Sequence, residues 1–309
     1  MAIILIACNK DFLDIKPEQS VLTQDVFSNV SASRAAVNGL YSLMQSTSYY
    51  GRDAMVIPEV LSDNMTRSVK TGNRYTGMNT MTHTATDANV SRMWSQIYRV
   101  VTNANAVIAN EANINKVANS LQKEEALQLV GEAYAVRAMA YFDLVKFFAR
   151  PLNHTSDGSH LGVPLVLLPI TSISEVVYPA SNTAKEVYDR ISLDIEEALK
   201  RLPASGNVIY DGTANSTLQK IRFNKFSTLA LKTRVAIYTE DWQKAIDASN
   251  LVIASGKYTL YPYASMVQDF RTQNSSESIF EVANNTNDNA GTDSYAYLSS
   301  QSGYGELLG

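Results

Sequence analysis

A helical period runs through most of this 309-residue chain and limits the folds that it can adopt. From about Asp25 to Ile253, apolar residues recur at spacings of three and four, which is the period of one buried helix face. The pattern is strongest over 123–149 and ends before Pro151, because proline cannot supply the next backbone donor. Further helices are predicted over 31–46, 90–110, 184–202, 224–239 and 242–255.

Small and aromatic residues indicate that these helices pack in pairs. One helix of each pair is rich in alanine and ends in aromatics, as at Ala133 and Tyr141 or at Ala236 and Tyr238. Alanines let two helices approach closely and tyrosines fill the gap where they splay, as in a tetratricopeptide-type hairpin. The predicted pairs are 123–149 with 184–202 and 224–239 with 242–255. We therefore predict a mostly α fold of tetratricopeptide-like stacked helix pairs, with long irregular loops and a little β structure.

Composition excludes several classes of protein. The formal net charge is −4, which argues against a nucleic-acid partner because phosphate contacts need a concentrated basic surface. One cysteine cannot form a disulfide within the chain, and one cysteine with three histidines is too few for a Cys/His zinc site. His154 and His160 flank Asp157 in a polar loop, where solvated side chains are a simpler interpretation than a metal site.

The first eight residues are apolar and stop abruptly at Cys8. They are too short to span a bilayer, which needs about 20 apolar residues. Leu5-Ile6-Ala7-Cys8 looks like the end of a bacterial lipoprotein signal, in which a small residue precedes the cysteine that becomes acylated. A short N-terminal strand with a buried thiol is the alternative interpretation.

The connections between helices are long and rich in polar and aromatic residues. The candidates for ligand binding are Asp63, Asn64, Arg67, Arg74 and Tyr75 in the loop 47–89, with Tyr295, Tyr297 and Tyr304 in the tail as a second rim. Flat rings and hydrogen-bonding side chains are what a sugar site needs. The alternative is that Asp63 and Asn64 cap a helix and that the tyrosines pack under loops. Ser278–Val282 is predicted to be a short strand, and Trp94 and Trp242 to be core residues.

No motif of a known catalytic centre or cofactor site is present. The nucleophile elbow, the P-loop, the Rossmann glycine pattern and the H-E-x-x-H pattern are all missing from the sequence. The adjacent carboxylates at 124–125 and 196–197 lie on helices whose apolar stripes point elsewhere, so we expect them to face solvent. We therefore predict a binding protein without a cofactor or a metal, not an enzyme.

Several short blocks together resemble one family. They are Cys8–Pro17, Ala35–Tyr41, Glu59–Asn64, Trp94–Tyr98 with Asn103–Asn105, Arg137–Val145 followed by Gly162–Val166, Ala230–Tyr238 with Asp241–Ile246, and Glu277–Glu281. In this order, over nearly the whole chain, they are similar to the N-terminal and middle part of SusD/RagB-type outer-membrane nutrient-binding lipoproteins. On this resemblance, 1–7 is the remnant of a lipoprotein signal and 8–270 is a SusD-like helical domain. Residues 271–309 are then the start of a truncated C-terminal ligand-binding region.

The resemblance implies a function as well as a fold. Such proteins are lipid-anchored at the outer membrane and exposed at the cell surface, and Cys8 is the position that would carry the lipid. Their loops hold an oligosaccharide, and the helical scaffold sits as a lid on a SusC-like TonB-dependent transporter. The resemblance implies no catalytic activity.

Two other classes of function stay open on the sequence alone. A tetratricopeptide-like scaffold that binds only protein would use its tyrosine-rich loops to face a partner. A hydrolase would need a pair of carboxylates opposed across a cleft, which one sequence cannot show.

Overall fold

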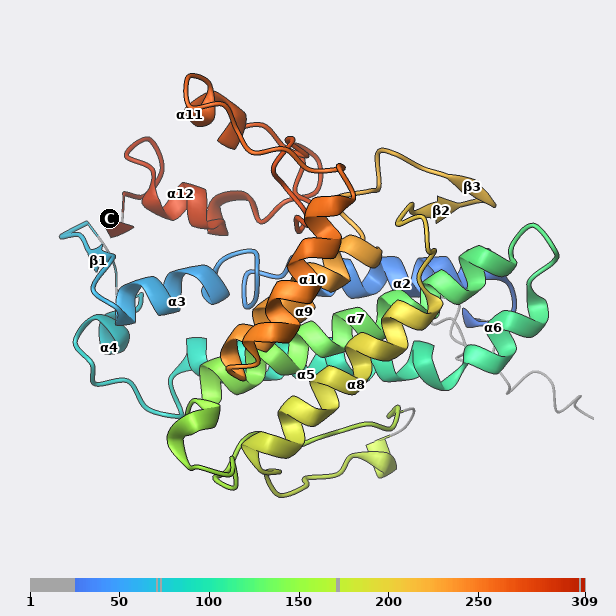
Figure 1. The fold of residues 1–309 in the computed structure, drawn as a ribbon. Helices are drawn as coiled ribbons and strands as arrows, with labels where there is room; N and C mark the ends of the chain where they lie inside the picture. Colours follow the sequence, from blue (N-terminus) through green and yellow to red (C-terminus); the bar gives the residue numbers. More distant parts are fainter. Residues whose placement is uncertain (1–25, 71, 73, 171–172, 306, 309) are drawn as a thin grey trace, which may run out of the picture.

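The computed structural model describes residues 26–70, 72, 74–170, 173–305 and 307–308, and Figure 1 shows their fold. The longer helices are α2 (Val30–Met44), α5 (Ala88–Ala109), α7 (Lys123–Phe148), α8 (Ala184–Arg201), α9 (Lys225–Tyr238) and α10 (Trp242–Ala254). The shorter helices are α3 (Asp53–Leu61), α4 (Thr76–Asn79), α6 (Glu111–Val117), α11 (Met266–Phe270) and α12 (Tyr295–Ser299). Single 3₁₀ turns, η2 (Leu152–His154), η3 (Ile173–Glu175) and η4 (Gly291–Asp293), lie in the connections. The prediction of a mostly α fold is confirmed.

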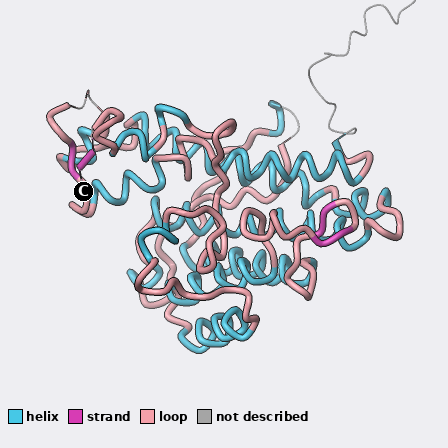
Figure 2. The backbone as a smooth tube through the Cα atoms, turned by 90° about the horizontal axis from the view of Figure 1, so that it is seen from above, coloured by secondary structure: helices cyan, strands magenta, loops and turns pink. Residues whose placement is uncertain are grey.

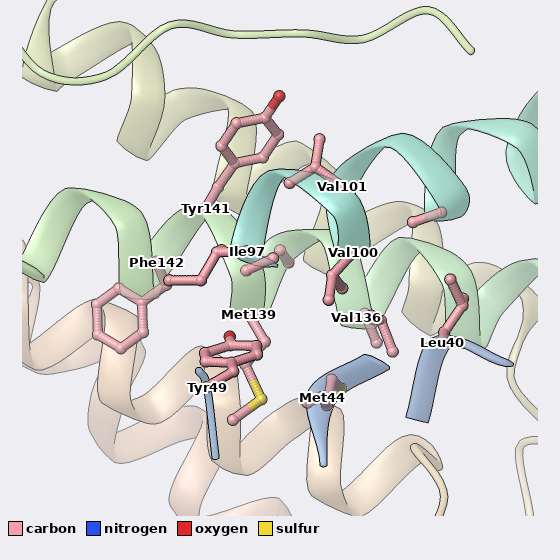
Figure 3. Close-up of a cluster of buried hydrophobic side chains, with 14 of the residues drawn as sticks. Leu40, Met44, Tyr49, Ile97, Val100, Val101, Val136, Met139, Tyr141 and Phe142 are labelled. Atoms are coloured by element: carbon pink, nitrogen blue, oxygen red, sulfur yellow. The ribbon is translucent and has the colours of Figure 1, made fainter. Parts of the chain in front are cut away.

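Helix α7 lies at the centre of the core. Almost every side chain from Glu125 to Val145 is buried, because α2, α5 and α8 pack around the helix. Figure 3 shows Val136 and Met139 of α7 beside Ile97 and Val100 of α5, and all four side chains are buried. Burial on all sides of a helix, and not along one stripe, is typical of such a central position.

Helices α7 and α8 form the first predicted pair and run antiparallel. Near one end of the pair, a Cβ placed on Gly131 would lie 3.1 Å from Cβ of Arg201. Toward the other end, the rings of Phe142 and Tyr188 lie 6.4 Å apart, edge to face. The absence of a side chain at Gly131 therefore allows the two helices to approach closely.

Helices α9 and α10 form the second predicted pair. A tight turn over 239–241 joins them, and Glu240 adopts a left-handed backbone conformation there, with φ 57°. At the start of α8, Thr183 and Glu186 exchange the reciprocal capping bonds that the sequence predicts. Both predicted helix pairs are confirmed.

The described β structure consists of two short antiparallel ladders. Strand β1 (Thr66–Arg67) pairs with β4 (Leu307–Leu308), and β2 (Ile209–Tyr210) pairs with β3 (Thr213–Ala214). Figure 2 shows them at opposite ends of the molecule. The β1–β4 ladder joins a loop after α3 to the far end of the chain, whereas β2 and β3 form a local hairpin.

The prediction of a strand over 278–282 is wrong. The segment forms no ladder with another described strand; instead, the backbone N–H of Glu281 donates to the carbonyl of Lys220, with 2.8 Å between N and O. The ring of Phe280 stacks on Phe223 at a centroid distance of 4.4 Å. The packing of Phe280 against the main core holds this segment in place. Its apolar residues therefore resemble a strand in the sequence, although they do not pair with one.

Glu125 is buried, against the prediction that both carboxylates at 124–125 face solvent. Its carboxylate pairs with the guanidinium of Arg34 from α2, and both side chains are almost fully buried. About two turns further along α7, buried Glu132 pairs with buried Arg222 at 2.9 Å. Because burying an unpaired charge is expensive, each of these carboxylates requires the cation that faces it.

A second buried charge network links three helices. Arg137 of α7 donates two hydrogen bonds to the carboxylate of Asp194 on α8, at 2.8 and 2.7 Å. Its remaining nitrogen donates to Oδ1 of Asn105 on α5, at 2.7 Å. All three residues are at most 3% exposed, so the network fixes how α5, α7 and α8 meet.

The two tryptophans differ in their surroundings, although both were predicted to lie in the core. Trp94 is partly buried and meets Phe148 edge to face at 5.0 Å between ring centroids. Trp242 is 59% exposed at the start of α10, so that prediction is wrong. Its helix packs on α9 and buries Ala245, Ala248 and Val252, and the tryptophan is not among the buried residues.

The buried network generates a prediction about stability. Asp194→Ala should lower the free energy of unfolding by about 3–5 kcal/mol, because it leaves the Arg137 guanidinium buried without its carboxylate. On the same helix, Asp189 pairs with Lys185 and both side chains are more than half exposed. Asp189→Ala should therefore change the free energy of unfolding by less than about 1 kcal/mol. Urea denaturation followed by circular dichroism measures both, and equal losses would contradict the role given to the network.

Candidate functional site

Two segments far apart in the sequence meet beyond the end of α3. The β1–β4 ladder places Thr66 opposite Leu308. Next to it, the hydroxyl of Ser68 donates to the carbonyl of Gly305, at 2.6 Å. Figure 1 shows α12 and β1 on the same side of the molecule. We name the described residues of 66–74 and 293–305 the loop–tail surface; it contains part of each predicted group of candidates.

An aromatic and charged cluster forms the exposed part of the loop–tail surface. The guanidinium carbon of Arg74 lies 5.2 Å from the centre of the Tyr304 ring, a cation–π geometry. The rings of Tyr304 and Tyr297 meet edge to face at 5.0 Å. Tyr297 is 38% exposed and Tyr304 42%, so both rings present apolar area to solvent beside a cation. One Nη of Arg74 also lies 3.7 Å from Oδ1 of Asp293.

Gly303 makes the tyrosine pair possible. A Cβ at this position would lie 2.1 Å from the backbone carbonyl oxygen of Tyr297, closer than any real contact. The next residue, Tyr304, donates its backbone N–H to that same carbonyl at 3.0 Å. Only a residue without a side chain lets the chain fold back this closely and bring the two rings together.

Tyr75 lies in the core, below the surface at which its ring was predicted to stack on a ligand. It is 2% exposed, and its hydroxyl donates to Oδ1 of Asp53 at 2.6 Å. Burial, together with the nearby Asp53 carboxylate, raises the pKa of Tyr75 well above its ordinary value. The ring offers no exposed face, so the alternative interpretation, that this tyrosine packs under a loop, holds.

A buried ion pair supports the surface from below. Nε of Arg52 donates to Oδ1 of Asp53 at 2.8 Å, and both side chains are almost fully buried. The same guanidinium donates to the backbone carbonyl of Asp293 at 3.3 Å. Arg52 therefore connects the start of α3 to the tail just before α12.

The remaining candidates are divided between the surface and its surroundings. Asp63 and Asn64 are exposed just after α3, and Asp63 has φ 62°, a conformation common at helix ends. Arg67 donates to the carbonyl of Gly72 at 2.7 Å within its own loop. Tyr295 is partly buried against the main core. Of the predicted residues, the structure brings Tyr304 into contact with both Arg74 and Tyr297.

Four residues that build this surface were not among the predicted candidates: Arg52, Asp53, Asp293 and Gly303. The pattern Ser302-Gly303-Tyr304-Gly305 was a local signal for a tight turn. No local signal connects Arg52 with a tail about 240 residues later, because only the folded chain places them together.

Further cavities lie between the described helices and loops, and two of them adjoin α8 and the α9–α10 turn. One, of about 730 Å³, is bounded by residues 152–159, the start of α8 and the α9–α10 turn. A second, of about 420 Å³, runs between α8, α9 and α10 over Leu193 and Val235. Near the first, the rings of His154 and His160 meet at 5.2 Å between centroids. The described residues contain no cluster of three His, Cys, Asp or Glu side chains that could hold a metal.

Comparison with known proteins gives the family. A SusD-like family model with the description "Starch-binding associating with outer membrane" matches residues 11–237. The chain belongs to the SusD-like family. This agrees with the resemblance found in the sequence, and it places the helical core, from α2 to most of α9, within the matched region.

Individual relatives of the SusD-like family support the assignment. The chain is 26% identical over 248 residues to SusD-like protein P38 of Formosa agariphila, covering 80% of this chain and 42% of that protein. It is 29% identical over 172 residues to a SusD-like protein of Bacteroides ovatus, covering 50% of this chain and 30% of that protein. A crystal structure of a SusD superfamily protein from Bacteroides vulgatus superimposes with a TM-score of 0.78 and 29% identity, covering 91% of this chain and 60% of the other. The chain thus spans less than two thirds of these relatives.

The family description mentions an association with the outer membrane, and the described helices can be compared with the requirements for a membrane span. Within the ranges that the structure describes, no helix combines the length and the apolarity that crossing a bilayer requires.

The burial of Tyr75 generates a second prediction. Tyr75→Ala should lower the free energy of unfolding by about 3–5 kcal/mol, because it leaves a cavity and removes the hydroxyl that the buried Asp53 carboxylate accepts. Tyr263, which is 94% exposed, is the matched control, and Tyr263→Ala should change stability by no more than about 0.5 kcal/mol. Thermal and urea unfolding report both values. If Tyr75→Ala were as mild as the control, the ring would be a surface residue after all.

Proposed function

We propose that this chain captures oligosaccharides at the cell surface and delivers them to a SusC-like TonB-dependent transporter. The observation that carries the proposal is the tyrosine pair of the loop–tail surface, beside Arg74 and Asp293, in a member of a family described as starch-binding. We also propose that residues 271–309 contribute to the ligand site, since Tyr297 and Tyr304 come from this part of the chain.

The chemistry of this surface suits a sugar ligand. A pyranose ring has apolar C–H faces, which stack on aromatic rings, and hydroxyl groups at its edges. Tyr297 and Tyr304 offer partly exposed rings, and the guanidinium of Arg74 and the carboxylate of Asp293 offer a charged donor and a charged acceptor. Hydrogen bonds that involve charged groups are the stronger ones, so these two side chains would orient the hydroxyls.

The proposal is binding without cleavage. Hydrolysis of a glycosidic bond needs two carboxyl groups that flank it. At the loop–tail surface, Oδ1 of Asp293 lies 3.6 Å from Arg52 and 3.7 Å from Arg74, and the Asp53 carboxylate is fully buried. This arrangement suits a carboxylate that positions a ligand better than one that must exchange a proton.

A second candidate function is a tetratricopeptide-like scaffold that binds protein and has no sugar site of its own. The observation in its favour is an exposed apolar stripe along α10, made of Trp242, Ile246 and Ile253, which are 51–75% exposed. Exposed apolar stripes of this kind often contact a partner protein. The same stripe is also compatible with the first proposal, in which a transporter is the partner.

The sugar proposal predicts loss of affinity without loss of stability. Tyr297→Ala and Tyr304→Ala should each weaken binding by about tenfold, corresponding to about 1.4 kcal/mol of lost stacking. Titration calorimetry against maltoheptaose and a panel of plant and host oligosaccharides measures the effect, with Tyr263→Ala as an exposed tyrosine outside the surface. A protein that binds none of the glycans but retains a protein partner would favour the scaffold instead.

Attachment to the membrane through a lipid on Cys8 is part of the proposal. Cys8 lies outside the described residues, and its support is the Leu5–Cys8 pattern together with the family description. Expressed behind a complete lipoprotein signal in a suitable bacterial host, the protein should partition with outer membranes. Cys8→Ala should release it in soluble form, because a triacylated terminus holds far more strongly than one chain. Equal retention of both forms would exclude the anchor.

A further inference from the structure

The cavity of about 730 Å³ at the start of α8 has the lining of a second ligand site. Its walls come from the loop 152–159, from Thr183 and Lys185, and from Tyr238, Thr239 and Glu240 at the α9–α10 turn. In Figure 1 the start of α8 lies in the lower part of the molecule, whereas β1 and α12 lie at the upper left. We propose that this cavity, which we name the turn cavity, binds a neutral oligosaccharide independently of the loop–tail surface.

An aromatic wall is the first feature of a sugar site here. Tyr238 lines the turn cavity and is 51% exposed, although it lies at the end of a packed helix. Its ring meets Phe142 of α7 edge to face, at 5.0 Å between centroids and 83° between planes. This contact fixes the ring from behind, so a ligand that stacks on its exposed part would meet an ordered platform.

Two carboxylates supply hydrogen-bond acceptors for sugar hydroxyls. Oε1 of Glu240 accepts a hydrogen bond from the side-chain amide of Asn153, at 2.8 Å, which ties the loop to the helix turn. Oδ1 of Asp157 accepts the backbone N–H of Ser159 at 3.0 Å. The hydrogen bonds from Ser159 lower the pKa of Asp157, so this carboxylate is ionised at neutral pH. A carboxylate can accept about four hydrogen bonds, so each of the two retains the capacity to accept one from a ligand hydroxyl.

The backbone of the turn cavity is built tightly. Gly158 has φ 68°, and a Cβ there would lie 2.8 Å from Leu152 and 3.1 Å from Lys185. The carbonyl of Gly158 accepts the backbone N–H of Lys185 at 3.0 Å. Glu240 also has a positive φ, of 57°, which is uncommon for a residue with a side chain. The cavity therefore has a defined shape, and its volume lies within the range of about 300–1,000 Å³ that is usual for ligand pockets.

The charges that line the turn cavity favour a neutral ligand over an acidic one. Asp157 and Glu240 are negative, and the one lysine of the lining, Lys185, has its ammonium 2.6 Å from the carboxylate of Asp189. An acidic sugar would meet net negative charge, whereas the vicinal hydroxyls of a neutral sugar would donate to the two carboxylates.

Hydrogen–deuterium exchange with maltoheptaose, cellohexaose and xylohexaose tests the proposal. At least one of these neutral probes should slow exchange at both 152–159 and 238–241, and trigalacturonate should do so only at much higher concentration. Tyr238→Ala should weaken the protection at these segments by about tenfold in probe concentration, as expected for the loss of one stacking platform. Tyr238→Phe should retain it, and Tyr263→Ala is the control.

The two sites can be told apart in the same experiment. Tyr297→Ala should leave protection at 152–159 unchanged and reduce it only at the loop–tail surface. Protection confined to the loop–tail surface overturns the turn-cavity proposal and leaves the proposed function standing. Protection confined to 152–159 and 238–241 supports the turn cavity and contradicts the sugar site proposed at the loop–tail surface. If Tyr238→Ala does not fold, Asp157→Asn at an exposed position should weaken the same protection, and no effect from that variant would also overturn the proposal.

Discussion

The pairing of Arg137 with Asp194 and Asn105 is the interaction on which the arrangement of the core depends. It joins α7, α8 and α5 at one buried point, where each partner satisfies charge or hydrogen bonds that the others would otherwise leave unmet. Asn105 also donates to the carbonyl of Val166, so the network holds the long connection between α7 and α8 as well. A buried charge network of this kind adds little net stability to the fold. Its main effect is on specificity, because any other helix register would leave a buried charge unpaired.

The helical period was sufficient to predict the fold but not the surroundings of individual polar residues. Helix positions, the two helix pairs and the capping box at Thr183 follow from local pattern, and the structure has them. Glu124 and Glu125 look equivalent in sequence, yet one is exposed and the other pairs with Arg34, 91 positions earlier. Which carboxylate is buried depends on a partner from another helix, and such a partner leaves no periodic trace.

The candidate site shows the same limit more sharply. Tyr75 and Tyr304 are the same residue type in similar polar segments, and one is buried while the other is 42% exposed. What separates them is the position of Asp53, which accepts the hydroxyl of Tyr75, and of Gly303, which lets Tyr304 fold back toward Tyr297. Composition singled out the loop and the tail that meet at this surface. The contacts that make one tyrosine a buried supporting residue and leave the other at the surface arise only when the two segments meet.

The β1–β4 ladder has a consequence for the time at which this surface comes into existence. Its two strands are separated by about 240 residues, and the tyrosines beside it belong to the last part of the chain. The helix pairs make mostly shorter-range contacts and can form while synthesis continues, but closing so long a segment is entropically slow. A nascent chain that has completed α10 therefore has the helix pairs α7–α8 and α9–α10 and no loop–tail surface. Ligand recognition at this surface would depend on a contact that forms only after residues 307–308 have been made, well after these helices.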